Sequence, residues 1–135
     1  MATSKVVYKG DLRTEMTHLN SGNIVITDAP VDNHGKGEAF SPTDLLATSL
    51  ASCILTITGI NARENNYNID GAEAMVTKVM YDNPRRVGEI IIDFTFKDNG
   101  LSNKDKTRIK NIVNTCPVAK SLNPDIKIII NFKFI

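Results

Sequence analysis

The sequence predicts an α+β fold with antiparallel sheets, and three observations lead to this class. Short β-rich segments come first, then a long apolar helical segment, and then a strand hairpin, an amphipathic helical segment and a final strand. Strands and helices do not alternate as repeated strand–helix–strand units, so the order favours α+β with antiparallel pairing over a parallel sheet. A chain of 135 residues suits one domain, and we expect a single domain over residues 1–135.

The first thirty residues have the composition of short strands separated by turns. Strands are expected to start near residues 6–8 and to cover residues 12–19 and 23–27, with a turn at residues 20–22. A polar, glycine-containing loop over residues 31–40 then leads to the helical part of the chain.

The strongest helix signal begins at Ser41. Ser41 can cap the helix, Pro42 suits the first helical position, and Asp44 stands where a capping box has an acid. The helix is expected to run from Pro42 to about Asn65. Apolar residues occupy nearly all of its faces, so the helix must be enclosed, and a partner subunit is the natural cover in so small a chain.

The second half of the chain predicts a hairpin, a helix and a strand. Strands are expected over residues 71–81 and 89–97, the second with alternating apolar side chains. Ser102 and Asp105 form a second capping box, and the helix behind it carries an apolar stripe that we expect to include Cys116 in its last turn. The final strand alternates in the same way.

Charge and composition argue against two classes of partner. The net charge is +1, whereas a nucleic-acid or membrane-surface role needs a concentrated basic face. The longest apolar stretch is interrupted by Thr48, Ser49, Ser52 and Thr56, and we take it as too short to span a bilayer. No signal peptide is visible, so we expect a cytoplasmic protein.

The chemistry of the chain depends on its two cysteines. Cys53 and Cys116 lie on two segments expected to be core helices, and are either a redox pair or two inert core residues. In a reducing compartment, paired cysteines are more often catalytic or sensing than structural. His18 and His34 do not combine with them in any zinc-site spacing, so we expect no metal site.

Two segments carry the most distinctive motifs of the chain: residues 37–53, GEAFSPTDLLATSLASC, and residues 116–122, CPVAKSL. Together they resemble the OsmC/Ohr family of thiol-dependent hydroperoxide reductases. The separation of the cysteines and the order of elements also agree, so the resemblance covers nearly the whole chain.

The resemblance implies a fold and a mechanism. The fold is an intertwined homodimer in which antiparallel sheets wrap around long central helices, with active sites at the subunit interface. The family's first cysteine, here Cys53, attacks the hydroperoxide, and its second, here Cys116, resolves the product as a disulfide. Arg13 stands at nearly the place of the arginine that activates the first cysteine in one branch of the family, with the role of an exposed strand residue as the alternative.

The expected reaction needs no bound cofactor. A thiolate cleaves the O–O bond and becomes a sulfenic acid, the second thiol condenses with it, and an external dithiol restores both thiols. Apolar surroundings favour an alkyl or lipid hydroperoxide as the small organic substrate.

The chain departs from the family at one position. The family's reductases have a glutamate just after the helix-start proline, and this chain has Thr43. Asp44 and Glu38 are the candidates to orient Arg13 instead, each with the alternative of being a plain surface acid.

Three further residues are candidates for the substrate pocket. His18 is a supporting candidate, with a strand-surface role as the alternative. Phe40 and Leu50 are candidates for its apolar wall, although Phe40 could equally be a core anchor.

Two other functions fit the same sequence. The protein could bind a small hydrophobic ligand or sense redox state with little peroxidase activity, which the change at Thr43 favours. A structural dimer without chemistry is the third possibility, and it requires the two thiols to lie far apart.

Overall fold

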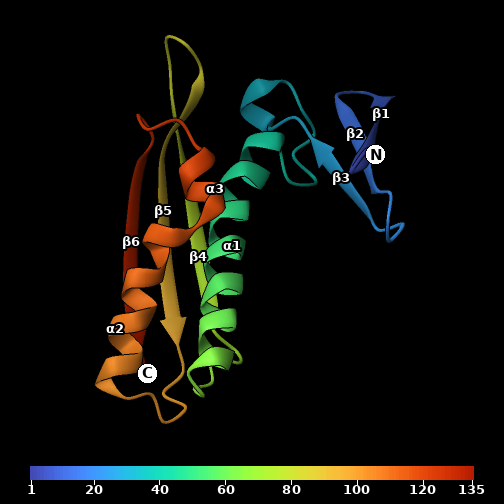
Figure 1. Cartoon of the computed structure of the whole chain (residues 1–135). Coiled ribbons are helices and arrows are strands. Elements are labelled where there is room, and N and C mark those ends of the chain that lie inside the picture. Colours follow the sequence, from blue (N-terminus) through green and yellow to red (C-terminus); the bar gives the residue numbers. More distant parts are fainter. The chain divides into compact units, whose positions relative to one another are not determined.

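A computed structural model describes all 135 residues of the chain. The chain forms two compact units, Met1–Leu46 and Ala47–Ile135, each with its own three-stranded sheet (Figure 1). The single domain expected over residues 1–135 stays a prediction.

The first unit contains three antiparallel strands. They are β1 (Ser4–Gly10), β2 (Arg13–His18) and β3 (Ile24–Asp28), ordered β1-β2-β3 in the sheet. A short 3₁₀ helix, η1 (Val31–Asn33), lies in the loop that follows. The three strands expected from the sequence are therefore confirmed.

The helix α1 (Pro42–Glu64) begins at the capping box expected from the sequence. The Ser41 N–H donates to Asp44 Oδ2 at 2.9 Å, and the Asp44 N–H donates to Ser41 Oγ at 3.1 Å. This reciprocal arrangement satisfies two backbone donors that a helix start leaves without partners.

The expectation that the longest apolar stretch is too short to span a bilayer was wrong. α1 has 23 residues, and its most apolar window has a mean hydropathy of 1.6, so it is long and apolar enough to cross a bilayer. Its hydroxyls do not shorten the apolar stretch, because those of Thr56 and Thr58 bond to carbonyls one turn earlier. The core helix of a globular protein meets the same criterion.

The second unit is built on a mixed sheet with the order β4-β5-β6. β4 (Glu73–Tyr81) and β5 (Arg86–Phe96) are antiparallel, but β5 and β6 (Lys127–Phe134) run parallel. The expectation of antiparallel pairing throughout was therefore wrong for this last pair. Figure 1 shows the reason: the helical segment between β5 and β6 carries the chain back to the end at which β5 began.

The crossover from β5 to β6 consists of three helical pieces. α2 (Asn103–Ile112) starts at the expected Ser102 capping box and is followed by the 3₁₀ helix η2 (Val113–Thr115) and by α3 (Pro117–Ser121). Cys116 was expected in the last turn of α2, and this was wrong.

The backbone of Cys116 is extended, with φ −68° and ψ 119°, and the residue caps α3. Pro117 explains this conformation, because a proline ring disfavours helical ψ in the residue before it. The proline therefore ends one helical segment and begins the next.

The core of the second unit lies between the sheet and the two longer helices. β5 alternates as expected, since the side chains at 90, 92, 94 and 96 are all buried. They pack against α1 and α2, which lie on one face of the sheet in Figure 1. The buried apolar residues of this core are Ala47, Leu50, Ala51, Ile54, Val87, Ile90, Ile92, Phe94, Phe96, Leu101, Ile109 and Cys116.

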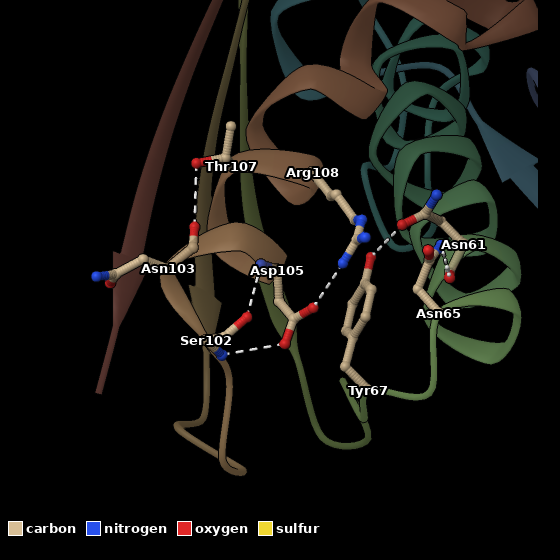
Figure 2. A network of polar contacts seen from close by, with 8 residues as sticks. All are labelled: Asn61, Asn65, Tyr67, Ser102, Asn103, Asp105, Thr107 and Arg108. Atoms are coloured by element: carbon tan, nitrogen blue, oxygen red, sulfur yellow. Dashed lines mark hydrogen bonds and ion pairs between the residues drawn. The ribbon is translucent and has the colours of Figure 1, made fainter.

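Two sets of polar contacts lie side by side, one at the end of α1 and one at the start of α2 (Figure 2). The Tyr67 hydroxyl donates to Asn61 Oδ1 at 2.6 Å, and Arg108 Nη1 donates to Asp105 Oδ1 at 3.0 Å. In Figure 2 the Arg108 guanidinium lies beside the Tyr67 hydroxyl, between the two helices. Burial raises the pKa of Tyr67, and the charge of Asp105 raises it further. The phenol thus stays protonated and keeps its donor.

The burial of β5 gives a stability prediction. Ile92→Ala should lower the free energy of unfolding by about 2–5 kcal/mol, because it removes a fully buried side chain. Ile91→Ala, one residue away on the partly exposed face, is the matched control and should cost clearly less. Urea unfolding of both variants tests this, and equal losses would contradict the described packing.

Candidate functional site

The two cysteines come together in the second unit. Cys53 lies on α1 and is partly buried, whereas Cys116 lies between η2 and α3 and is 0% exposed. Both are free thiols and pack in the same core. They are close enough for a hydrogen bond from one thiol to the other to affect the ionisation of Cys116. The structure therefore brings together two sulfurs that are distant in sequence.

Several groups act on the ionisation of Cys116. Burial raises the pKa of its thiol, and the hydrogen bond and charge of Cys53 raise it further. The backbone N–H groups of Ala119 and Val118 act in the opposite direction, and the former donates to Cys116 Sγ at 3.4 Å. Because the raising effects prevail, the Cys116 thiol is protonated at neutral pH.

The difference in exposure predicts an order of labelling. In the native protein at pH 7.5, iodoacetamide should modify Cys53 well before Cys116, since Cys116 is both inaccessible and protonated. Peptide mass mapping over a time course measures the order. Labelling in 6 M guanidinium chloride, where both thiols are exposed, is the control. Faster labelling of Cys116 in the native protein would contradict the described burial.

A second cluster lies in the first unit, where Arg13 and Asp28 face each other on neighbouring strands. Arg13 Nε donates to Asp28 Oδ1 at 2.7 Å, and Arg13 Nη2 donates to Asp28 Oδ2 at 2.8 Å. The Asp28 side chain is 1% exposed, and that of Arg13 is 31% exposed. The Glu38 N–H also donates to Asp28 Oδ2, at 3.2 Å. The hydrogen bonds from Arg13 lower the pKa of Asp28, and Asp28 raises the pKa of Arg13.

The acid that binds Arg13 is one that the sequence reasoning missed. Of the two candidates, Asp44 caps α1. Glu38 acts on Arg13 through its charge, which raises the pKa of the arginine less than Asp28 does.

The signal for Asp28 lay in the strand register. An antiparallel hairpin pairs residues whose numbers have a constant sum, and the pairs Thr17 with Ile24 and Arg13 with Asp28 share that sum. Once the turn between β2 and β3 is placed, the partner of Arg13 therefore follows. Thr43, the residue that replaces the family's glutamate, lies at the α1 cap, where its hydroxyl is 3.2 Å from Ser41 Oγ.

The remaining pocket candidates lie apart from one another along the chain. His18 is exposed at the end of β2, and its Nδ1 hydrogen-bonds to Ser21 Oγ at 2.6 Å. Phe40 is 50% exposed, and its carbonyl accepts the Asp28 N–H at 3.0 Å. Leu50 is fully buried in the core of the second unit. The pocket roles of these three residues stay predictions.

Two clefts open on the second unit. One, of about 470 Å³, lies along the second half of α1 and the loop after it. The other, of about 480 Å³, lies between β6 and the η2–α3 segment that carries Cys116. The second cleft is lined by Lys110, Val113, Asn114, Ala119, Lys120, Ile128, Ile130 and Phe132. The structure contains no group of three or more His, Cys, Asp and Glu side chains that could hold a metal ion.

The ion pair predicts how stability depends on pH. Asp28 has a lowered pKa in the folded chain, so between that value and the ordinary aspartate pKa of about 3.9 the unfolded chain binds more protons. The stabilisation is complete above the ordinary value and is lost as the pH falls through the folded one. The urea midpoint of the wild type should therefore fall more between pH 6 and pH 3 than that of Asp28→Asn. Equal falls would contradict this.

Comparison with known proteins gives the family. A family model described as OsmC-like protein matches residues 35–131. The chain belongs to the OsmC-like family. A search of curated proteins finds no match.

Solved structures of the OsmC-like fold match nearly the whole chain. A Psychrobacter arcticus protein, assigned provisionally to osmotic stress induction and detoxification response, is 59% identical over 98% of this chain and 96% of its own, with a TM-score of 0.93. The organic hydroperoxide resistance protein OhrB of Bacillus subtilis is 20% identical over 98% of both chains, with a TM-score of 0.68. An organic hydroperoxide resistance protein, OsmC, of Legionella pneumophila is 14% identical over 98% of both chains, with a TM-score of 0.72.

Proposed function

We propose that this OsmC-like protein is a thiol peroxidase that reduces organic hydroperoxides. The observation that carries the proposal is the contact between the Cys53 and Cys116 thiols in the core of the second unit. Two fold relatives, from Bacillus subtilis and Legionella pneumophila, are named for organic hydroperoxide resistance, and this supports the choice of substrate.

The reaction proceeds in two steps at the sulfurs. The Cys53 thiolate attacks the outer oxygen of the hydroperoxide, the O–O bond breaks, and Cys53 becomes a sulfenic acid while the alkoxide takes up a proton and leaves as an alcohol. The Cys116 thiol then condenses with the sulfenic acid. An S–S bond forms, the S–O bond breaks, and water leaves.

The environments of the two thiols suit these separate roles. Cys53 is partly exposed and can meet a substrate, whereas Cys116 is sealed in the core beside it. A raised pKa keeps the proton on Cys116 until condensation, when the departing hydroxide takes it up to form water. A buried resolving thiol is also protected from direct oxidation.

The cycle closes by thiol–disulfide exchange with an external dithiol, which becomes oxidised as both cysteines are reduced. No bound cofactor takes part. We place this chemistry in the cytoplasm, where reductants of this kind are maintained.

The proposal includes two features carried over from the family. Arg13 is the cation that favours the Cys53 thiolate, and the working form is a homodimer. The second feature accords with the many apolar side chains that the single chain leaves exposed, among them Ile24 and Ile26 on β3 and Ile60 on α1.

Treatment with peroxide tests the function. One equivalent of cumene hydroperoxide should lower the intact mass by two hydrogens, through a Cys53–Cys116 bond, and dithiothreitol should sustain turnover. Cys53→Ser should abolish peroxide consumption, and Cys116→Ser should accumulate the sulfenic acid, which dimedone traps. Equal rates of hydroperoxide consumption by the wild type and Cys53→Ser would refute the proposed peroxidase function.

The cleft beside β6 favours a second candidate function, the binding of a small hydrophobic ligand. Its floor is apolar, from Ile128, Ile130 and Phe132, and Lys110 and Lys120 also line it. An unchanged mass after mild peroxide, together with saturable binding of an apolar fluorescent probe, would favour this function over the enzyme.

A further inference from the structure

The cleft beside β6 has a long apolar floor. Ile128, Ile130 and Phe132 occupy alternate positions of the strand, so they share one face, and all three line the cleft and are half-buried. At about 3.3 Å per residue, this floor extends roughly 13 Å along the strand. An extended alkyl chain of similar length fits the floor, and a cleft of about 480 Å³ has room for it.

The charged side chains of the cleft are all cations. Lys110 and Lys120 are exposed and line it together with Asn114, and no acidic side chain lines it. The Lys110 ammonium lies 5.9 Å from the centre of the Phe134 ring, so an aromatic face already attracts it. Lys120, in the last turn of α3, is therefore the more available cation. This arrangement fits a ligand with an alkyl chain and one anionic group.

The same cleft touches the chain on both sides of Cys116. Val113 and Asn114 line it just before the cysteine. Ala119 and Lys120 line it just after. Ala119 also donates its backbone N–H to Cys116 Sγ at 3.4 Å. A ligand in the cleft therefore contacts the residue whose amide holds the sulfur, and its binding restrains the segment that places Cys116.

We propose that this cleft is a regulatory site for an alkyl carboxylate, which pairs with Lys120 and opposes formation of the Cys53–Cys116 disulfide. The inference names the ligand class of the second candidate function, and its effect on the disulfide rests on the proposed peroxidase function. An S–S bond is about 2.05 Å long, closer than two free thiols approach, so bridging shifts the Cys116 segment and reshapes the cleft. A ligand that binds the dithiol form more tightly draws the chain toward that form.

Decanoate, below the concentration at which it forms micelles, is the probe for the site. Titration of the ¹⁵N-labelled dithiol protein with decanoate should shift the amide signals of Asn114, Ala119 and Ile130. Octanoate should bind about tenfold more weakly, because it buries two fewer methylene groups. Shifts confined to the other cleft, at Ile60 and Ile69, or the absence of saturable shifts, would overturn the proposal.

Two lysine substitutions test the position of the carboxylate. Lys120→Gln should weaken decanoate binding about threefold, as expected for an exposed ion pair, and should leave the binding of uncharged decanol unchanged. Lys133→Gln removes the same charge from the opposite face of β6 and is the matched control, with no change expected. Equal losses of decanoate binding in both variants, or an equal loss of decanol binding in Lys120→Gln, would overturn the proposed pairing.

The dissociation constants of decanoate in the two redox forms test the regulatory effect. Diamide oxidises the two thiols and takes up their hydrogens as the S–S bond forms. The bridged protein should bind decanoate about fivefold more weakly than the dithiol form, and by linkage decanoate should oppose bridging by the same factor. Equal dissociation constants in the two forms, or a protein that diamide cannot bridge, would refute the regulatory effect.

The failures of the two proposals are distinguishable. A protein that binds decanoate as described but consumes no hydroperoxide refutes the peroxidase function and leaves the ligand site in place. A protein that consumes hydroperoxide but binds no decanoate refutes only the regulatory site. A decanoate affinity that falls as the protein concentration rises would show that a second copy of the chain covers the cleft, and this too would overturn the proposal.

Discussion

The packing of α1 against the β5–β6 crossover is the constraint on which the site depends. Cys53 is placed by the middle of a long helix, and Cys116 by the short segment between η2 and α3. Both elements reach the same core because β5 presents a continuous row of buried isoleucine and phenylalanine side chains to them. A change in that row would move the two sulfurs relative to each other, so the chemistry of the thiols depends on the packing beneath them.

Two buried titratable groups of the structure differ in their state of ionisation. In the first unit, Asp28 is buried and ion-paired with Arg13, whose hydrogen bonds lower the pKa of the carboxyl group. In the second unit, burial raises the pKa of the Cys116 thiol and holds the thiol in its neutral form. The buried Asp28 carboxylate therefore stays charged beside its counter-ion, whereas the buried Cys116 thiol stays neutral.

Much of the fold could be predicted because its signals are local. The Ser41 and Ser102 caps, the extent of α1 and the alternation of β5 each follow from a few neighbouring residues. The parallel pairing of β6 depends instead on where a crossover returns the chain, which no short pattern encodes. The position of Cys116 was missed for a different reason. The apolar spacing suited a continued helix, and the steric effect of Pro117 on the residue before it prevailed.

The importance of the two cysteines could be read from the sequence, whereas the ion pair between Arg13 and Asp28 could not. The cysteines are the only two in the chain, and their flanking sequences carried the family resemblance. Asp28, by contrast, is an ordinary acid at the end of a strand, and only the register of β2 and β3 makes it the partner of Arg13. The residues around Thr43 give no indication of it.

The two sulfurs differ in how firmly the backbone holds them. Cys53 is carried by a regular helix of 23 residues, whose hydrogen-bond ladder resists local displacement. The segment around Cys116 is held by longer bonds, such as those from the Cys116 N–H to Val113 and from the Leu122 N–H to Ala119, both 3.4 Å. In the proposed oxidation of the two thiols to a disulfide, we expect the backbone to move mainly in this short segment around Cys116, while the long helix stays in place.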